Sequence, residues 1–404
     1  MTAAPARRPR LTRFGWLVLT AGIVSALLFL GFSVGAGFVV FRVGSQFVAA
    51  LEPARLAEQT PWVNAPFKKL WSAELTRAHG NEDRMPSIVM LWPSADRARE
   101  VWVAPAQADQ PWARFALDGE PLLPVKGPRE GRPVDVEGNG RIEFLTPYRG
   151  KDLVISDAQG KQRTTLSAPN EFEWARVVDF NEDGRPDVVV VGRESAEVMA
   201  LDGTVLLNER FRVVADATVT QWDGRKGKEL LVVSTGRQEG GTQARLGLGL
   251  VLTVLDETGQ VVWEKRLDRF WYSKGVVCVV DANGQLTIAV AALESTIRGL
   301  TSVQLIGVDE SGAVAWRFLL GRVGSYLHSV VPMATGRFGP GRGEQVATAL
   351  DDGTLVILTP DGQEVARQAM GEHIRSLRRF SRPNQTDALA VELRDSVVVV
   401  ALRS

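Results

Sequence analysis

Short apolar segments separated by polar, glycine-containing loops fill the chain from residue 87 onward. Seven copies of a loop followed by an apolar segment can be aligned: SIVMLW from Ser87, IEFLTP from Ile142, DVVVVG from Asp187, ELLVVS from Glu229, LTIAVA from Leu286, QVATAL from Gln345 and DALAVE from Asp387. Successive copies start 42 to 59 residues apart. Short apolar runs bounded by turn residues are typical of buried β-strands.

A second pattern follows these segments: an apolar strand, an Asp/Gly turn and a further strand that often contains tryptophan. Examples are VMALDGTVLLNERF, LTVLDETGQVVWEKRL, QLIGVDESGAVAWRFLL and LVILTPDGQEVARQAM. Apolar runs joined by such turns indicate β-hairpins. Each unit therefore has about four short antiparallel strands, which at this spacing is typical of a propeller blade. The predicted fold is all-β, a seven-bladed β-propeller.

The last unit lacks a fourth strand. It contains SLRRF, DALAVEL and SVVVVAL, after which the sequence stops at Ser404. The segment KKLWSAEL at 68–75 resembles the fourth strands VVWEKRL and AVAWRFL and precedes the first unit. We therefore expect the propeller to cover residues 67–404, with strand 68–75 completing the seventh blade and removing a free sheet edge.

The segment from Phe14 to Phe41 has a different character, because it contains no charged residue over 28 positions. As a helix it would be about 42 Å long, against a hydrocarbon core of about 30 Å. A cleaved signal peptide is the rival interpretation, but its apolar region typically has about 7–15 residues. We therefore expect one transmembrane helix at 14–41, acting as an uncleaved signal anchor before the propeller.

The charges around this segment predict its orientation. Arg7, Arg8, Arg10 and Arg13 precede it, and only Arg42 follows closely. Positive charge is retained on the cytoplasmic side, so residues 1–13 form a cytoplasmic basic tail and the propeller lies in the periplasm or at the cell exterior. Residues 42–66 then form a stalk or linker. This single-pass arrangement favours a membrane protein or membrane complex as partner.

The overall composition excludes several classes of function. Lys plus Arg and Asp plus Glu both number 47, which argues against a nucleic-acid-binding protein. Cys278 is the only cysteine, so no intramolecular disulfide and no paired-cysteine metal site can form.

The stretch DFNEDGRPDVVVVG at 179–192 carries the strongest chemical signal. Asp179, Asn181, Asp183 and Asp187 occupy positions 1, 3, 5 and 9 of a loop, and the Arg185 carbonyl occupies position 7. Alternate oxygen donors in a tight loop suit Ca²⁺, which would also relieve repulsion among the carboxylates. An EF-hand is not expected, because position 12 is Val190 and lies in a strand pattern. The alternative is an acidic turn without metal.

These residues also carry a resemblance to known repeats. DFNEDGRPDVVVVG resembles the signature of FG-GAP or VCBS repeats, the calcium-binding blades of integrin alpha chains, and the Asp/Gly turns followed by tryptophan resemble PQQ-like repeats. The resemblance implies a ligand-binding or scaffolding module in which structural calcium stiffens blade loops.

By the same resemblance, a second calcium set lies in a partial copy of the acidic loop. Its side chains are Asp135, Glu137, Asn139 and Glu143, with the carbonyl of Arg141. A metal-free turn, in which Arg141 offsets the charge, is an equal alternative.

Enzyme chemistry has a weaker basis. A quinoprotein dehydrogenase usually has a vicinal cysteine pair, which one cysteine excludes. Trp174, His328 and His373 lie in segments that lead into first strands of blades. Together with Asp216 they could line one shallow pocket near the axis, or they are ordinary loop residues.

Two hypotheses for function follow. The first is a membrane-anchored propeller that binds a protein or serves as a scaffold in a membrane complex. The alternative is a small-molecule or carbohydrate sensor or enzyme that uses the face near His328 and His373.

Overall fold

The structure is a computed structural model that describes part of the chain. The described residues are 65–74, 89–92, 100–105, 110–128, 131–136, 139–148, 150–181, 186–220, 222, 229–235, 249–296, 299–322, 330–339, 343–382, 385–394 and 396–403. They all lie in the second of two units of the chain, residues 56–404. The expected tail at 1–13 and span at 14–41 lie outside them, as does the linker before residue 65. Among the described residues, no helix has the length and hydropathy needed to cross a membrane.

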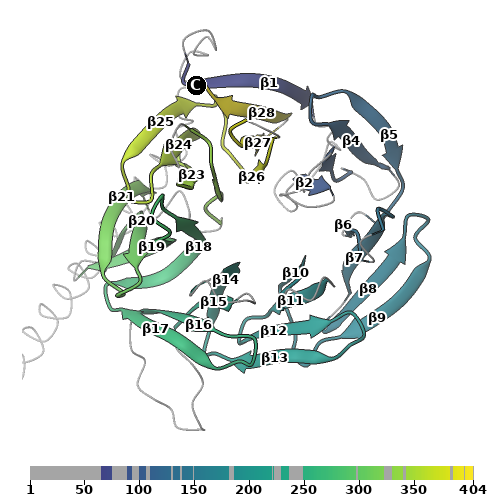
Figure 1. Cartoon of the computed structure of the whole chain (residues 1–404), viewed down its shortest axis with the longest axis horizontal. Coiled ribbons are helices and arrows are strands. Elements are labelled where there is room, and N and C mark those ends of the chain that lie inside the picture. Colours follow the sequence, from purple (N-terminus) through teal and green to yellow (C-terminus); the bar gives the residue numbers. More distant parts are fainter. Residues whose placement is uncertain are drawn as a thin grey trace, which may run out of the picture. The chain divides into compact units, whose positions relative to one another are not determined.

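Seven four-stranded antiparallel sheets surround a common axis, which confirms the predicted all-β seven-bladed propeller (Figure 1). We number the blades in chain order, with the innermost strand of each given first. Blade 1 contains β2 (Val89–Trp92), β3 (Glu100–Val103), β4 (Trp112–Ala116) and β5 (Pro121–Val125). Blade 2 contains β6 (Arg132–Val134), β7 (Glu143–Tyr148), β8 (Asp152–Asp157) and β9 (Gln162–Ser167). Blade 3 contains β10 (Trp174–Val178), β11 (Asp187–Val191), β12 (Ser195–Ala200) and β13 (Val205–Arg210).

The remaining blades follow the same order. Blade 4 contains β14 (Val214–Thr220), β15 (Glu229–Ser234), β16 (Leu250–Leu255) and β17 (Val261–Leu267). Blade 5 contains β18 (Phe270–Val280), β19 (Leu286–Thr296), β20 (Gly299–Asp309) and β21 (Val314–Arg322). Blade 6 contains β22 (Met333–Gly336), β23 (Gln345–Ala349), β24 (Thr354–Leu358) and β25 (Glu364–Ala369). Blade 7 contains β26 (Ser376–Phe380), β27 (Ala388–Glu392), β28 (Ser396–Leu402) and β1 (Phe67–Glu74).

The two ends of the propeller sequence meet in blade 7. Strand β1 pairs antiparallel with β28, from Phe67 opposite Leu402 to Glu74 opposite Ser396. The early segment that resembles a fourth strand therefore does complete the last blade (Figure 1). This pairing leaves no blade with a missing outer strand.

The near-continuous valine run of β11 is explained by burial on both faces of the sheet. Val189 and Val191 pack in a cluster with residues of blade 4, including Leu230. Val188 and Val190 pack on the opposite face with residues of blade 2, including Leu145. Because each blade is covered by two neighbours, the usual apolar and polar alternation of a half-exposed strand is lost.

Tryptophans on three outer strands join each of their blades to the next. Each indole N–H donates to a backbone carbonyl in the hairpin turn between the third and fourth strands of the following blade. The three bonds run from Trp71 to Leu117 at 2.8 Å, from Trp263 to Glu310 at 2.9 Å and from Trp316 to Pro360 at 2.7 Å. The repeated tryptophans noted in the sequence therefore belong to the contacts between blades.

The glycine of the receiving turn shows how close this contact is. Gly362 has φ +81°, and a Cβ built on it would lie 2.6 Å from the ring of Trp316. Gly160 occupies the same position in the turn of blade 2, with φ +79°. The outer strand β5 of blade 1 contains no tryptophan, and a Cβ built on Gly160 would meet nothing within 4 Å. The two glycines thus share a backbone conformation and differ in the neighbouring blade.

This pair of glycines generates a stability prediction. Gly160→Ala should lower the free energy of unfolding by about 1–2 kcal/mol, the cost of a left-handed conformation for a residue with a side chain. Gly362→Ala should cost about 1–3 kcal/mol more, because it also displaces Trp316. Urea unfolding midpoints of the two variants measure the difference. Equal losses in both variants would show that the tryptophan contact is loose.

Candidate functional site

The antiparallel order of each blade determines which loops share a face of the ring. The loop from the first to the second strand and the turn from the third to the fourth strand lie on one face, here called the bottom face. The segments that lead into the inner strands lie on the opposite, top face. The acidic loops at 135–143 and 179–187 therefore belong to the bottom face, and Trp174 and His373 belong to the top face.

The acidic loop of blade 3 is closed by its own last carboxylate. Asp187 is 2% exposed, and its Oδ2 accepts a hydrogen bond from the backbone N–H of Phe180 at 3.0 Å. Phe180 is buried, while Asp179 and Asn181 are half-buried. Asp183 and Arg185 lie outside the described residues. The hydrogen bond brings the two ends of the loop together, as a calcium cage between them would require.

The same closure recurs in the partial acidic loop of blade 2 and in two loops that lack the motif. In each case the side chain of the first residue of the second strand accepts a hydrogen bond from a backbone N–H of the loop. The N–H of Val136 donates to Glu143 at 3.1 Å, that of Trp222 to Glu229 at 2.7 Å and that of Gly339 to Gln345 at 2.8 Å. Gln345 is neutral, so the hydrogen bond that closes the loop needs an acceptor but not a charge. The acidic residue at position 9 therefore has a structural role that does not depend on metal.

The partial acidic loop of blade 2 uses its polar atoms within the protein. Asp135 accepts from the N–H groups of Asn139 at 3.0 Å and Gly140 at 2.8 Å, and Asn139 accepts from the N–H of Arg141 at 2.8 Å. The second oxygen of Glu143 pairs with Arg163 on β9. These contacts favour the metal-free turn, with Arg163 as the cation that pairs with Glu143.

Calcium at either loop stays a prediction. Within the described residues, no group of three or more His, Cys, Asp and Glu side chains is arranged to hold a metal ion. In the first loop, Asp179, Asn181 and Asp187 retain oxygen donors at one end of the blade, and Asp183 and the Arg185 carbonyl would complete the set. In the second loop, Glu137 lies outside the described residues.

On the top face, Trp174 and Asp216 lie at the same level of neighbouring inner strands. Each lies opposite the fifth residue of the second strand of its own blade: Trp174 opposite Val191 on β11, and Asp216 opposite Val233 on β15. Asp216 Oδ2 accepts from the N–H of Val276 on β18 at 2.9 Å, and Oδ1 accepts from the N–H of Ala217 at 2.8 Å. Asp216 therefore links the inner strand of blade 4 to that of blade 5.

The environment of Asp216 alters its ionisation. Burial raises the pKa of Asp216 to about 6, although its backbone N–H partners and the positive charge of Arg176 favour the carboxylate. The group therefore changes charge just below neutral pH. Its position ties this charge to the packing of two blades.

Of the two histidines of the predicted pocket, the structure describes His373. His373 precedes β26 in blade 7 and reaches solvent. Partial desolvation of its ring and then the charge of Arg375 lower its pKa, while Asp351 opposes this. His328 lies outside the described residues. The structure thus places Trp174 and Asp216 in adjacent blades and His373 three blades away from each of them.

Three arginines were missed as a group by the sequence reasoning. Arg132 on β6, Arg176 on β10 and Arg378 on β26 each pair with the third residue of the second strand of their blade, Leu145, Val189 and Ala390. They therefore lie at one level of the ring, two residues below Trp174. Aligning the inner strands by register would have found them, whereas spacing along the chain does not.

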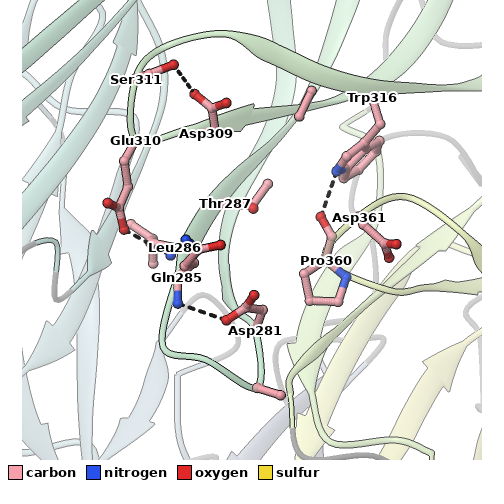
Figure 2. Close-up of a pocket in the computed structure, with 12 residues that line it drawn as sticks. Asp281, Gln285, Leu286, Thr287, Asp309, Glu310, Ser311, Trp316, Pro360 and Asp361 are labelled. Carbon is pink, nitrogen blue, oxygen red and sulfur yellow. Dashed lines mark hydrogen bonds between the residues drawn. The ribbon is translucent and has the colours of Figure 1, made fainter.

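A separate groove lies on the bottom face between blades 5 and 6. It has a volume of about 660 Å³, and its lining includes Asp281, Asp309, Glu310, Asp361 and Trp316 (Figure 2). Each carboxylate accepts hydrogen bonds from its own or a neighbouring turn; Asp281, for example, accepts from the N–H of Gln285 at 2.8 Å. The construction of the turns accounts for this acidic lining.

The acidic loop of blade 3 generates a metal prediction. Calcium at about ten times its dissociation constant should stabilise the folded state by about 1.4 kcal/mol, and a chelator should lower the melting temperature modestly. Asp183→Ala should abolish this calcium increment without removing the Asp187 closure. Asp135→Ala in the partial loop is the matched control and should keep the increment. A wild-type melting curve that does not respond to calcium would show that the loop is only an acidic turn.

Asp216 generates a pH prediction. A raised pKa in the folded state gives stability that is present below the unfolded pKa and lost as the pH rises through about 6. Wild type should therefore lose up to about 3 kcal/mol relative to Asp216→Asn between pH 4 and pH 7.5. Urea unfolding at several pH values gives this difference. Parallel pH curves for the two proteins would contradict it.

Asp309→Asn is a control in which the stability should change with pH in the opposite direction. Its hydrogen bonds, led by that from Ser311, lower the pKa of Asp309. Wild type should therefore be the more stable protein at neutral pH and lose that advantage on acidification.

Comparisons with known proteins support the fold. No protein-family model and no curated protein matches the sequence. A chain in the crystal structure of BBS1N in complex with ARL6DN is 12% identical, with a TM-score of 0.55, and the match covers 84% of this chain and 98% of that one. Hydrazine synthase of Kuenenia stuttgartiensis is 10% identical, with a TM-score of 0.52 and coverage of 80% and 98%. Virginiamycin B lyase of Staphylococcus aureus is 13% identical, with a TM-score of 0.50 and coverage of 83% and 100%. At these identities the similarity establishes the β-propeller fold alone.

Proposed function

We propose that this chain is a protein-binding or scaffolding subunit of a membrane complex, with its propeller outside the cytoplasm. The observation that carries the proposal is the unequal height of the blades. Strands β18, β19 and β20 each have 11 residues and β21 has 9, whereas the other described strands have between 3 and 8. Blade 5 therefore extends beyond its neighbours' strand pairing at the top face.

This extension is ordered by its own contacts. Phe270 and Leu293 are 2% and 5% exposed, and Arg317 lies over the Phe270 ring with its guanidinium carbon 5.3 Å from the ring centroid. Glu294 accepts from Gln304 at 2.5 Å and pairs with Arg317 at 3.2 Å. The upper end of blade 5, residues 270–275, 291–296, 299–304 and 319–322, is thus a continuation of the sheet, with shifts in strand register.

Apolar side chains are exposed on and beside this surface. Leu319 on β21 is 63% exposed, Tyr272 on β18 is 38% exposed and Val330, before β22, is 70% exposed. Val330 lies beside β18, since a Cβ on Gly275 would be 4.0 Å from its Cγ1. Exposed aliphatic and tyrosine side chains on and beside a sheet are suited to burial against a protein partner. They support the top face at blade 5 as the docking surface.

The membrane part of the proposal rests on the sequence. The uncharged segment at 14–41 with arginines before it supports an anchor whose propeller is extracytoplasmic. An anchored propeller would meet a membrane partner at a high local concentration, so a surface of modest area would suffice.

The small-molecule alternative is favoured by a different observation. Arg132, Arg176 and Arg378 place three guanidinium groups on inner strands at one level of the ring. That arrangement suits an anionic ligand and is independent of the surface on blade 5.

Co-purification of the full chain in mild detergent tests the docking surface. Leu319→Asp and Val330→Asp should each weaken partner binding about 10- to 100-fold, because a buried aliphatic side chain contributes about 1.5–3 kcal/mol. Leu123→Asp is the matched control, since Leu123 is 84% exposed on the outer strand β5 of blade 1. Partner retention by all three variants would refute the surface on blade 5. A wild-type chain that carries a bound small molecule and no stoichiometric protein would favour the alternative.

A further inference from the structure

The three arginines on the inner strands form a group because of strand register. Arg132, Arg176 and Arg378 come from blades 2, 3 and 7, and each lies opposite the third residue of the adjoining second strand. Blades 7, 1, 2 and 3 follow one another around the ring, so the strands β26, β6 and β10 that carry the arginines lie on an arc of four blades (Figure 1). They lie at the same height on strands that face the centre of the propeller.

Contacts along this arc hold two of the arginines close together. Arg132 Nη1 donates to the carbonyl of Ala175 at 2.7 Å, which brings its guanidinium group to the residue beside Arg176. The guanidinium carbon of Arg176 lies 6.0 Å from the centroid of the Trp174 ring. Trp174 thus provides an aromatic surface next to the charge on the top-face side.

The positive charge of this arc is not neutralised by ion pairs at Arg132 or Arg176. No carboxylate among the described residues forms an ion pair with either of them. Asp216 is the acidic neighbour of Arg176, but its two oxygens accept the N–H groups of Ala217 and Val276. Arg176 and Arg378 are exposed to solvent although they lie on innermost strands, so an ion in water can reach them.

The charges of the arginines also affect one another's pKa values. Burial, then the charges of Arg378 and Arg176, lower the pKa of Arg132 to about 10. Arg378 reaches solvent at one side, but desolvation by the surrounding strands and the charge of Arg176 lower its pKa, while Glu392 opposes this. The folded protein therefore holds three guanidinium groups close enough to affect one another at this level.

We propose that Arg132, Arg176 and Arg378 form a binding site for a phosphate group at the axis of the propeller. The phosphate is that of a free phosphate ion or of a small phosphomonoester. A phosphate dianion would offset the mutual repulsion of the three guanidinium groups. Its tetrahedral oxygens can also accept hydrogen bonds from several directions, whereas a single planar carboxylate engages one guanidinium fork. Trp174 would contact the organic part of an ester on the top-face side.

Calorimetric titration of the full chain in detergent, at neutral pH and low chloride, tests the site with inorganic phosphate and with glycerol 3-phosphate as probes. Both should bind to wild type with one site per chain. Arg176→Gln and Arg378→Gln should each weaken binding about 10- to 100-fold, the loss expected for one hydrogen bond to a charged group. Arg266→Gln is the matched control, because Arg266 lies on the outer strand β17 and pairs with Asp268 at 2.8 Å. It should bind both probes as wild type does.

The two probes distinguish the source of the phosphate. Tighter binding of the ester indicates an organic ligand that reaches Trp174, and in that case Trp174→Ala should remove the preference. Succinate is the competing dianion, and binding of succinate as tightly as phosphate would overturn the phosphate assignment. Absence of binding at about 10 mM phosphate, a concentration that would fill most of a site with a Kd of about 1 mM, would overturn the site.

Thermal melting of the unliganded variants separates binding from a purely structural role. If the arginines are a binding site, Arg176→Gln should melt at the wild-type temperature or above, since a repulsion is removed, and phosphate should raise the melting temperature of wild type only. A lowered melting temperature with no phosphate response in wild type would show that the arginines serve packing. Loss of partner binding in the blade 5 variants would leave these results unchanged.

Discussion

The pairing of β1 with β28 is the constraint on which the other contacts depend, because it converts a row of sheets into a ring. Phe67 lies opposite Leu402, so the pairing joins residues at the two ends of the propeller sequence. A blade with three strands would leave Trp71 without a place beside the turn of blade 1, where its indole now donates to Leu117. Without β1 the ring would be open between blade 7 and blade 1. The two blades at that opening would expose apolar side chains that are now buried between them.

Closure of the ring explains why strand composition departs from simple alternation. In β11, β15, β23 and β27 every residue is buried, since both faces of each blade are covered. The polar residues of these strands gather at their ends, where Asp187, Glu229 and Gln345 accept hydrogen bonds from loop backbone. The juxtaposition of acidic loops and valine runs in the sequence is thus one structural unit, a buried strand whose first residue fastens the preceding loop.

The sequence was sufficient for the fold and insufficient for the site, and the reason lies in the range of the interactions. Hairpin turns, apolar runs and the tryptophan of KKLWSAEL are local or repeated signals, and they predicted the blades and the closing strand. The grouping of Arg132, Arg176 and Arg378 depends on strand register in three blades, which no local pattern contains. Asp216 could be placed near the axis from its strand, but its link to Val276 in another blade could not. The extra height of blade 5 likewise follows from pairing between β18, β19 and β20 rather than from any one segment.

The likeness to calcium-binding repeats must be judged against the closure seen in loops without the motif. Gln345 makes with a neutral amide the bond that Asp187 makes with a carboxylate, so position 9 would retain an acceptor even in a chain that never bound metal. An acidic residue there is therefore weak evidence for calcium, and the discriminating positions are those with no part in closure. Asp135, for example, is not such a position, because it caps its own turn through Asn139 and Gly140. In these blades the hydrogen bond sets the shape of the loop, and a metal ion would add its stabilisation to a loop that is already closed.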